Sequence, residues 1–150
     1  MIKQLLALGA FVSTAAFAQV TPSDARVRAT VPAQKSAGAY LTLQSVQAVR
    51  VVGASSPAAN AIEMHQMAME GQTMKMRAVT AIDLPAGVKV NLAQAGYHLM
   101  FIDLKQQLKD GDTVPVTLIV ENAAKKRDSV IVQVPVKQIG YSAPAAAHQH

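Results

Sequence analysis

Residues 63–77 read EMHQMAMEGQTMKMR and contain five of the seven methionines of the chain and one of its four histidines. Two explanations for this concentration compete. Methionine is flexible and fills irregular gaps in hydrophobic cores. Its thioether sulfur is also a soft ligand of the kind that selects Cu(I). The stretch therefore predicts either adaptable packing or a soft-metal site, and the surrounding elements must decide between them.

The middle of this stretch predicts a β-hairpin formed by residues 62–69 and 73–79, with a turn at Glu70-Gly71. In that register His65 lies directly opposite Met76, with Cβ atoms about 4.5–5.5 Å apart. Side chains alternate along each strand, so one imidazole and four sulfurs are expected to share a face. The residues expected on this face are His65, Met67, Met69, Met74 and Met76.

A second cluster lies in GYHLMFIDL, residues 96–104, where His98 and Met100 are two residues apart. On a strand these two side chains point to the same side, and Leu99 and Phe101 point to the other side, toward the core. Neighbouring strands then offer two imidazoles and several thioethers. Such neutral ligands suit Cu(I), whereas Zn(II) more usually takes Cys, His and carboxylates, and Ca(II) and Mg(II) require oxygen.

Packing remains an alternative for single residues of both clusters. A lone His-x-Met on a strand is a weak signal, and at least two of Met67, Met69 and Met74 are expected to be rim or packing residues. Met64 points to the opposite face of the hairpin, so we assign it to the core. The joint spacing H-x(10)-M-x(21)-H-x-M, which starts at residue 65, is much harder to explain by packing.

Short β-like runs separated by turn residues occupy the chain from about residue 21 to residue 138. No segment shows a long stripe with helical period, although Leu104–Leu108 has room for one helical turn. Many short strands with regular turns indicate an all-β protein, an antiparallel sandwich or barrel. The expected strands lie near residue 27 and at residues 38–45, 48–54, 62–69, 73–79, 88–92, 96–104, 114–121 and 129–136.

Residues 1–18 read as a secretory signal, with Lys3 as the positive region, Leu5–Val12 as the apolar region and AFA as the cleavage site. The apolar run is short for a membrane span, and an uncleaved anchor or a buried helix is the alternative. We then expect one domain at residues 19–138 and a flexible Ala/Pro/His tail at residues 139–150. A periplasmic protein without stable membrane insertion follows.

Composition excludes several classes of function. The chain has no cysteine, which removes thiolate chemistry and excludes a blue-copper electron-transfer site. Its net charge of +5 is scattered, without the basic, aromatic-rich stripe of a nucleic-acid-binding protein. No Ser/His/Asp set is convincing, and a mature chain beginning at Gln19 lacks the N-terminal His of copper monooxygenases. We therefore expect a protein that is not an enzyme.

The spacing H-x(10)-M-x(21)-H-x-M resembles the signature of the periplasmic copper chaperones called PCuAC. The segments GASSPAA, MHQMAMEGQTMKMR, LPAG and GYHLMFIDLKQQLKDGDTVPVTL resemble this family as well, and the similarity covers roughly residues 38–136. The resemblance implies a cupredoxin-like antiparallel β-sandwich or Greek-key barrel with an exposed Cu(I) site. Carried over position by position, the implied ligands are His65, Met76, His98 and Met100.

The resemblance also implies a function: delivery of Cu(I) to the CuA or CuB centre of a haem–copper oxidase. The implied partner is an oxidase subunit or another copper-assembly protein. A periplasmic copper buffer that serves resistance would have the same site and stays open, as does a structural sandwich with a methionine contact patch. In some members, tails rich in His and Met add a Cu(II) site. For His148 and His150, a Cu(II)-binding tail and an inert tail both stay open.

Overall fold

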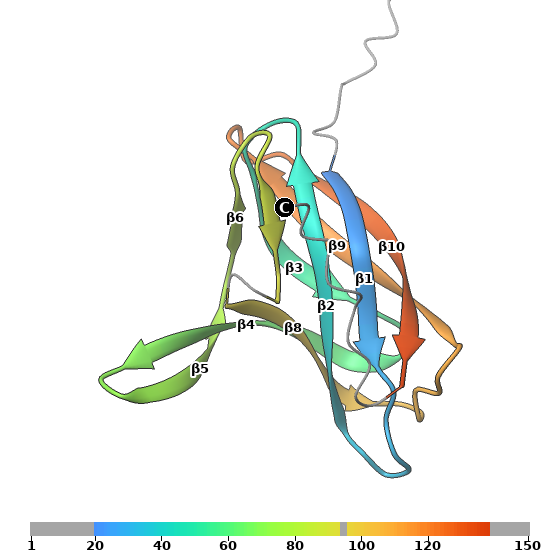
Figure 1. The fold of residues 1–150 in the computed structure, drawn as a ribbon. Helices are drawn as coiled ribbons and strands as arrows, with labels where there is room; N and C mark the ends of the chain where they lie inside the picture. Colours follow the sequence, from blue (N-terminus) through green and yellow to red (C-terminus); the bar gives the residue numbers. More distant parts are fainter. Residues whose placement is uncertain (1–19, 94–95, 139–150) are drawn as a thin grey trace, which may run out of the picture.

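The computed structural model describes residues 20–93 and 96–138, and every regular element within them is a β-strand. Figure 1 shows these strands folded together, and their buried hydrophobic side chains form one core cluster. The expected signal at residues 1–18 and the expected tail at residues 139–150 lie outside the described residues. The strands are β1 (Val20–Arg28), β2 (Ser36–Ser45), β3 (Val49–Ser55), β4 (Ala59–Glu70), β5 (Thr73–Val79), β6 (Ile82–Leu84), β7 (Lys89–Asn91), β8 (Tyr97–Leu104), β9 (Thr113–Asn122) and β10 (Arg127–Lys137).

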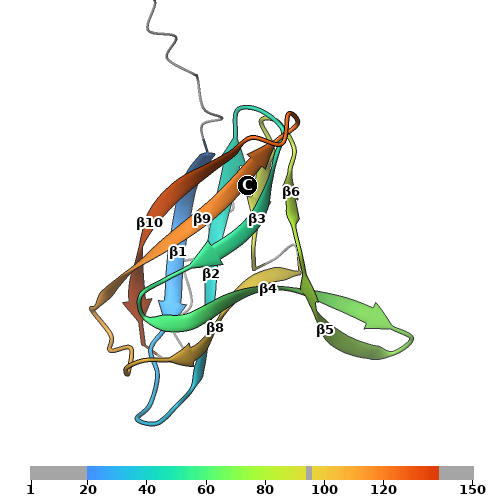
Figure 2. The same cartoon turned by 180° about the vertical axis from the view of Figure 1, so that it is seen from behind.

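Hydrogen bonds join the strands in the order β5-β4-β8-β2-β1-β10-β9-β3-β6, with β7 beside β2. Among the described strands the pairing is antiparallel except between β1 and β10, which run parallel. The sheet bends over on itself, so that β1 and β2 form one layer, in front in Figure 1, and β3, β9 and β10 form a second layer, which faces the viewer in Figure 2. The predicted all-β sandwich is therefore confirmed, with one parallel pair added to the antiparallel pattern.

The core lies between these layers and takes every second side chain of the long strands. Leu43 in β2, Phe101 in β8 and Leu118 in β9 are fully buried. Burying one such side chain stabilises the fold by roughly 1.5–3 kcal/mol. Because the inward side chains of β2, β4 and β8 belong to the core, their alternate residues must point outward. These outward residues form the face on which the two predicted clusters meet.

The strands follow the predicted runs closely, with two differences. β6 (Ile82–Leu84) was not expected, because three residues are too few to display an alternating pattern. It is nevertheless anchored, since Ile82 and Leu84 are fully buried. The helical turn allowed at Leu104–Leu108 does not form. Instead β8 ends at Leu104, and the backbone N–H of Leu108 donates to the Thr30 hydroxyl over 2.9 Å.

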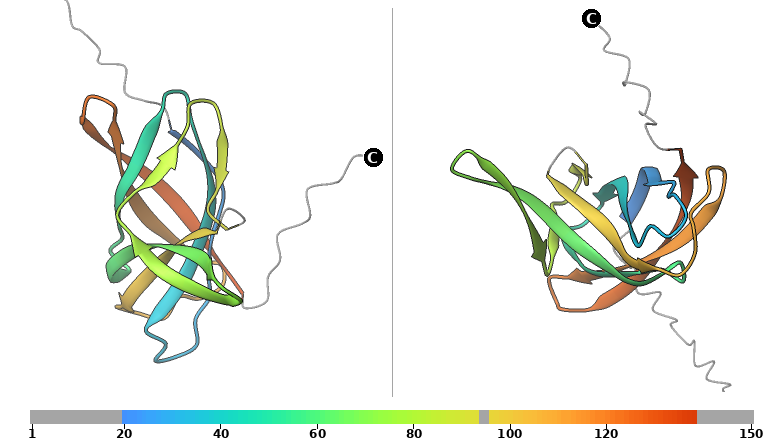
Figure 3. Two further views of the ribbon diagram at one scale, coloured as in Figure 1. Left: turned by 90° about the vertical axis from the view of Figure 1, so that its left-hand side faces the viewer. Right: turned by 90° about the horizontal axis from the view of Figure 1, so that it is seen from below.

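The hairpin of β4 and β5 projects from the body of the sandwich, as Figure 1 and the right panel of Figure 3 show. The first part of β4 pairs with β8, and its second part pairs only with β5. β5 is the last strand of the hydrogen-bonded order, and nearly all of its side chains are exposed. The described part of the chain contains no helix with the length and hydrophobicity needed to span a membrane.

Candidate metal centre

β4 brings the two predicted clusters together, because it pairs with β5 along one edge and with β8 along the other. His65 in β4 lies directly opposite His98 in β8. On the other side His65 faces Ala78 of β5, while Met67 faces Met76. Two sequence segments that are separated by about twenty residues thus become adjacent through one shared strand.

The predicted register of the hairpin, with His65 opposite Met76, is wrong by two residues. The turn occupies Gly71 and Gln72, so Glu70 pairs with Thr73. Gly71 has a φ of 64°, a conformation that side chains with a Cβ rarely adopt and that glycine adopts freely. The expected turn would have placed Glu70 at the first turn position, where tight hairpin turns require a positive φ. A shift of two residues keeps each side chain on its predicted face.

His65 and Met76 are therefore diagonal neighbours, and they are in contact. Nδ1 of His65 lies 2.9 Å from Sδ of Met76. The rings of His65 and His98 lie edge to face, with their centroids 5.9 Å apart. We call the side of β5, β4 and β8 that carries these residues the outer face, since it points away from the core.

Met100 joins the same group through the register of β8. It lies directly opposite Glu63 of β4, two residues from His98 on one side of its strand. It is thus diagonal to His65, a position within reach of a long side chain. His65, His98 and Met100 are half-buried, whereas Met76 is 49% exposed. Three neighbouring strands consequently place all four predicted ligands on one surface.

Glu63 is a member of this group that the sequence analysis missed. Its Oε2 lies 2.7 Å from Nε2 of His65, the ring nitrogen that does not face Met76. An ionised carboxylate can only accept, so Nε2 carries a proton, and in the neutral ring Nδ1 then has its lone pair on the side of the sulfur. Residues two apart on a strand point to the same face, so the spacing of Glu63 and His65 in the sequence already indicates that their side chains are neighbours.

The other methionines separate into two environments. Met64 is buried, 6% exposed, which confirms its assignment to the core. Met69 and Met74 are opposite each other in the hairpin and more than half exposed, so neither packs in the core. A role at the rim of the site, the other role expected for them, stays a prediction. Within the described residues, no three or more His, Cys, Asp or Glu lie together in a group able to hold a metal ion. A metal on the outer face would therefore need the thioethers.

Comparison with known proteins identifies the family. The sequence model of the LpqE-like lipoprotein family matches residues 20–136. The solution structure of CuI-DR1885 from Deinococcus radiodurans is similar, with 32% identity, 83% of each chain covered and a TM-score of 0.57. The chain belongs to the LpqE-like family, the family of PCuAC domains. The predicted resemblance to PCuAC is thus confirmed.

Two further proteins are similar to this chain, one in structure and one in sequence. The copper-bound PCuAC domain from PmoF2 shares the fold at 20% identity, with a TM-score of 0.64 over 80% of this chain and 93% of that domain. A protein of Leifsonia xyli subsp. xyli, named as the lipoprotein Lxx21020, is 34% identical over 88 residues. That match covers 58% of this chain and 51% of the relative, so the chain spans about half of the relative's length.

In this PCuAC protein, His98 is held between two rings. His65 lies on one side, and the Tyr40 ring of β2 lies 6.3 Å away, centroid to centroid. The Arg26 and Arg28 guanidiniums lie 5.3 and 5.8 Å from the centroid of Tyr40. Burial, together with the charge of His65, lowers the pKa of His98 below its ordinary value of 6.5. His98 therefore stays neutral into mildly acidic conditions, and neutral imidazole is the metal-binding form.

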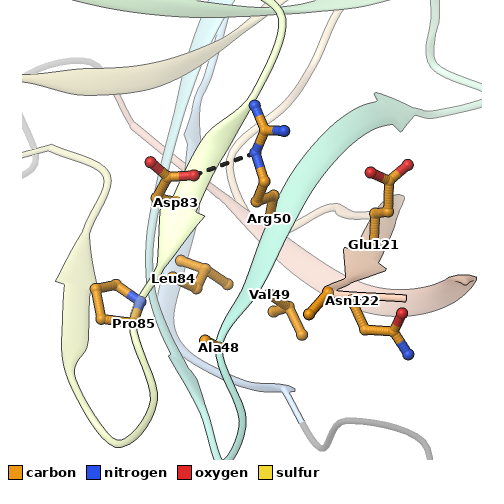
Figure 4. Close-up of a pocket in the computed structure, with 9 residues that line it drawn as sticks. Ala48, Val49, Arg50, Asp83, Leu84, Pro85, Glu121 and Asn122 are labelled. Carbon is orange, nitrogen blue, oxygen red and sulfur yellow. Dashed lines mark ion pairs between the residues drawn. The ribbon is translucent and has the colours of Figure 1, made fainter. Parts of the chain in front are cut away.

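A hollow elsewhere on this PCuAC domain is not part of the outer face. It has a volume of about 270 Å³ and lies at one end of β3, β6 and β9 (Figure 4). Its lining is mostly apolar, and an ion pair of 3.2 Å joins Arg50 to Asp83 beside it. Neither histidine nor methionine contributes to it. The soft donor atoms of the domain are therefore separate from this hollow.

Proposed function

We propose that this PCuAC protein binds one Cu(I) ion on the outer face of β5, β4 and β8 and passes the ion to another protein. The contact between Nδ1 of His65 and Sδ of Met76 carries the proposal, because it brings a ring nitrogen and a thioether close enough together to share one metal ion. The proposed ligands are His65, Met76, His98 and Met100.

The chemistry of this donor set supports Cu(I). Two thioethers and two neutral imidazoles are soft or borderline donors, and the set has no thiolate or ligating carboxylate. A monovalent ion with neutral ligands keeps its single charge, and Glu63 lies beside the site to offset it. The relatives agree with this choice, since DR1885 was solved in a CuI form and the PmoF2 domain in a copper-bound form.

Exposure of the site supports delivery rather than permanent storage. Met76 belongs to the edge strand β5 and is half exposed, so a partner can approach the metal from that side. Without a thiolate, the ion can leave by exchanging one neutral ligand at a time for a ligand of the acceptor. We propose that the acceptor is the CuA or CuB centre of a haem–copper oxidase, reached directly or through another copper-assembly protein. The protein itself carries out no catalysis.

The family supports an exported location for this delivery. LpqE-like proteins and the Leifsonia relative are named as lipoproteins. We propose that residues 1–18 direct the chain to the periplasm, where the domain works. An additional Cu(II) site at His148 and His150 stays a proposal, because both residues lie outside the described part of the chain.

Anaerobic Cu(I) titration against a chromogenic competitor tests the binding site. The wild type should take up one tightly held equivalent, and His65→Ala or Met76→Ala should weaken that binding by roughly tenfold or more, which corresponds to about 1.4 kcal/mol. Lys75→Ala is the matched control, because this residue precedes Met76 and points to the other side of β5. Unchanged affinity in both ligand variants would refute the site.

A transfer assay separates delivery from buffering. The Cu(I)-loaded protein would be mixed with an apo CuA domain, and formation of the binuclear centre would be followed by absorbance after a reoxidation step. A chaperone should fill the acceptor faster than Cu(I) released from a small-molecule chelator of equal affinity. Equal rates would favour the copper buffer.

A further inference from the structure

Three methionines of the hairpin are not used by the proposed four-ligand site: Met67, Met69 and Met74. Met69 lies directly opposite Met74, and Met67 lies directly opposite Met76. Strand alternation and this register place all of them on the outer face. They belong to the hairpin of β4 and β5, which projects from the sandwich (Figure 1). The hairpin therefore continues the line of sulfur atoms from Met76 toward its own tip.

Core packing does not explain Met69 and Met74, whereas Met67 is half-buried. Met69 is 61% exposed and Met74 is 54% exposed. A side chain that is so exposed gains little stabilisation from the burial of apolar surface. The hairpin has no neighbour along the outer edge of β5 among the described strands. Met69 and Met74 thus lie at the solvent-exposed surface, where a dissolved ion can reach them.

The geometry suits a soft cation. Directly opposed residues have Cβ atoms about 4.5–5.5 Å apart, and residues two apart on a strand lie on the same side. Methionine has three rotatable side-chain bonds, so three thioethers at these positions can converge on one point. Thioethers select Cu(I) over the common divalent ions.

The charges of the hairpin lie on its other side. Lys75 and Arg77 both pair with Glu70, and these three residues alternate with the outward methionines. Hydrogen bonds from Lys75 and then Arg77 lower the pKa of Glu70 below its ordinary value, so this carboxylate stays ionised and holds both cations on that side of the hairpin. No cation of the hairpin therefore projects among the three sulfur atoms to repel a Cu(I) ion.

We infer that Met67, Met69 and Met74 form a second Cu(I) site, weaker than the four-ligand site and made only of thioethers. Its existence is independent of the proposed function. A role for it in loading rests on that function: Met67 faces Met76, so an ion can pass to the four-ligand site by exchanging one thioether at a time.

The test is a Cu(I) titration of protein labelled with ¹³C at the methionine methyl groups, observed by NMR. The methyl signals of Met69 and Met74 should shift with the second equivalent, and the double variant Met69→Leu/Met74→Leu should bind only one. Leucine keeps the size and apolar character of the surface but removes the sulfur. Met64→Leu is the matched control, since it removes a thioether of the same strand from the buried side and should still bind two equivalents.

A change of pH provides a second readout. Thioethers take up no proton in water, so the affinity for the second equivalent should change less than about threefold between pH 7.5 and pH 5.5. The inference is overturned if the double leucine variant still binds two equivalents of Cu(I). It is also overturned if the methyl signals of Met69 and Met74 do not shift when the second equivalent is added. A weakened first equivalent in His65→Ala, with the affinity for the second unchanged, would support it. Wild-type affinity for both equivalents in His65→Ala would refute the four-ligand site alone.

Discussion

The carboxylate of Glu63 lies 2.7 Å from Nε2 of His65, on the edge of the ring that faces away from Met76. Both nitrogens of this imidazole are therefore engaged, one by a charged acceptor and the other toward a sulfur. Carboxylates that hold the second nitrogen of a metal-binding histidine fix its tautomer and raise its basicity. Glu63 is thus a positioning residue for the proposed Cu(I) site rather than a ligand.

We predict that Glu63→Ala weakens Cu(I) binding about 10- to 100-fold, because the ring loses the group that orients it. Glu63→Gln should lie between this variant and the wild type, since the amide oxygen can still accept the Nε2 proton. Competition titration under anaerobic conditions measures both. Glu70→Ala is the control: this carboxylate belongs to the same strand but pairs with Lys75 and Arg77 on the other face. Equal affinities for the Glu63 and Glu70 variants would contradict the role.

The lowered pKa of His98 predicts a pH dependence of the metal-free fold. In the unfolded chain this histidine takes up a proton near pH 6.5, whereas in the folded protein burial and His65 delay protonation to lower pH. The unfolded state therefore binds more protons in this window, so the free energy of unfolding falls as the pH drops below about 6.5. Above that pH both states are neutral and His98 contributes no dependence.

Urea denaturation of the metal-free protein across this pH range measures the effect. The groups around His98 are His65 of β4 and Tyr40 of β2, with Arg26 and Arg28 behind the tyrosine ring. His98→Gln should flatten the part of the profile below pH 6.5, since glutamine does not titrate. A profile that stays the same in this variant would assign the dependence to other groups.

Two methionines of β4 should differ sharply in their effect on stability. Met64→Ala removes a buried side chain and should lower the free energy of unfolding by about 2–5 kcal/mol. Met69→Ala removes an exposed side chain of the same type and should stay within about 0.5 kcal/mol of the wild type. Urea denaturation monitored by circular dichroism compares them. Similar losses in both variants would mean that the hairpin packs against something in solution.

The sequence predicted the faces of the strands better than their alignment. Alternation placed Leu99 and Phe101 in the core and His98 and Met100 outside, and their burial confirms this. It could not choose between neighbouring hairpin registers, because a shift of two residues satisfies the same pattern. The deciding feature was local: Gly71 is the residue that accepts a positive φ in the turn.

Other features of the fold depend on contacts between segments that are far apart in the sequence. The parallel pairing of β1 with β10 joins Val27 to Val136 from opposite ends of the domain. The sequence of neither strand indicates that it pairs with the other. The three residues of β6 become a strand only because β3 lies beside them. His65 and His98 are neighbours because β8 pairs with β4, and neither segment alone indicates this pairing. The chemical types of the predicted ligands were readable from sequence, whereas their proximity required the topology.

Metal removal should loosen the projecting hairpin before it affects the sandwich. The proposed ion links β5, β4 and β8 through residues of each, whereas without it β5 is an edge strand joined to β4 alone. A ligand that binds only the folded state stabilises it by about 2.7 kcal/mol at a free concentration one hundred times its dissociation constant. Amide hydrogen exchange of Cu(I)-loaded and metal-free protein should therefore differ most in β5 and the second part of β4. Exchange in the buried strand β9 should follow only the change in global stability. Uniform slowing across all strands, without an excess in the hairpin, would place the ion somewhere other than the outer face.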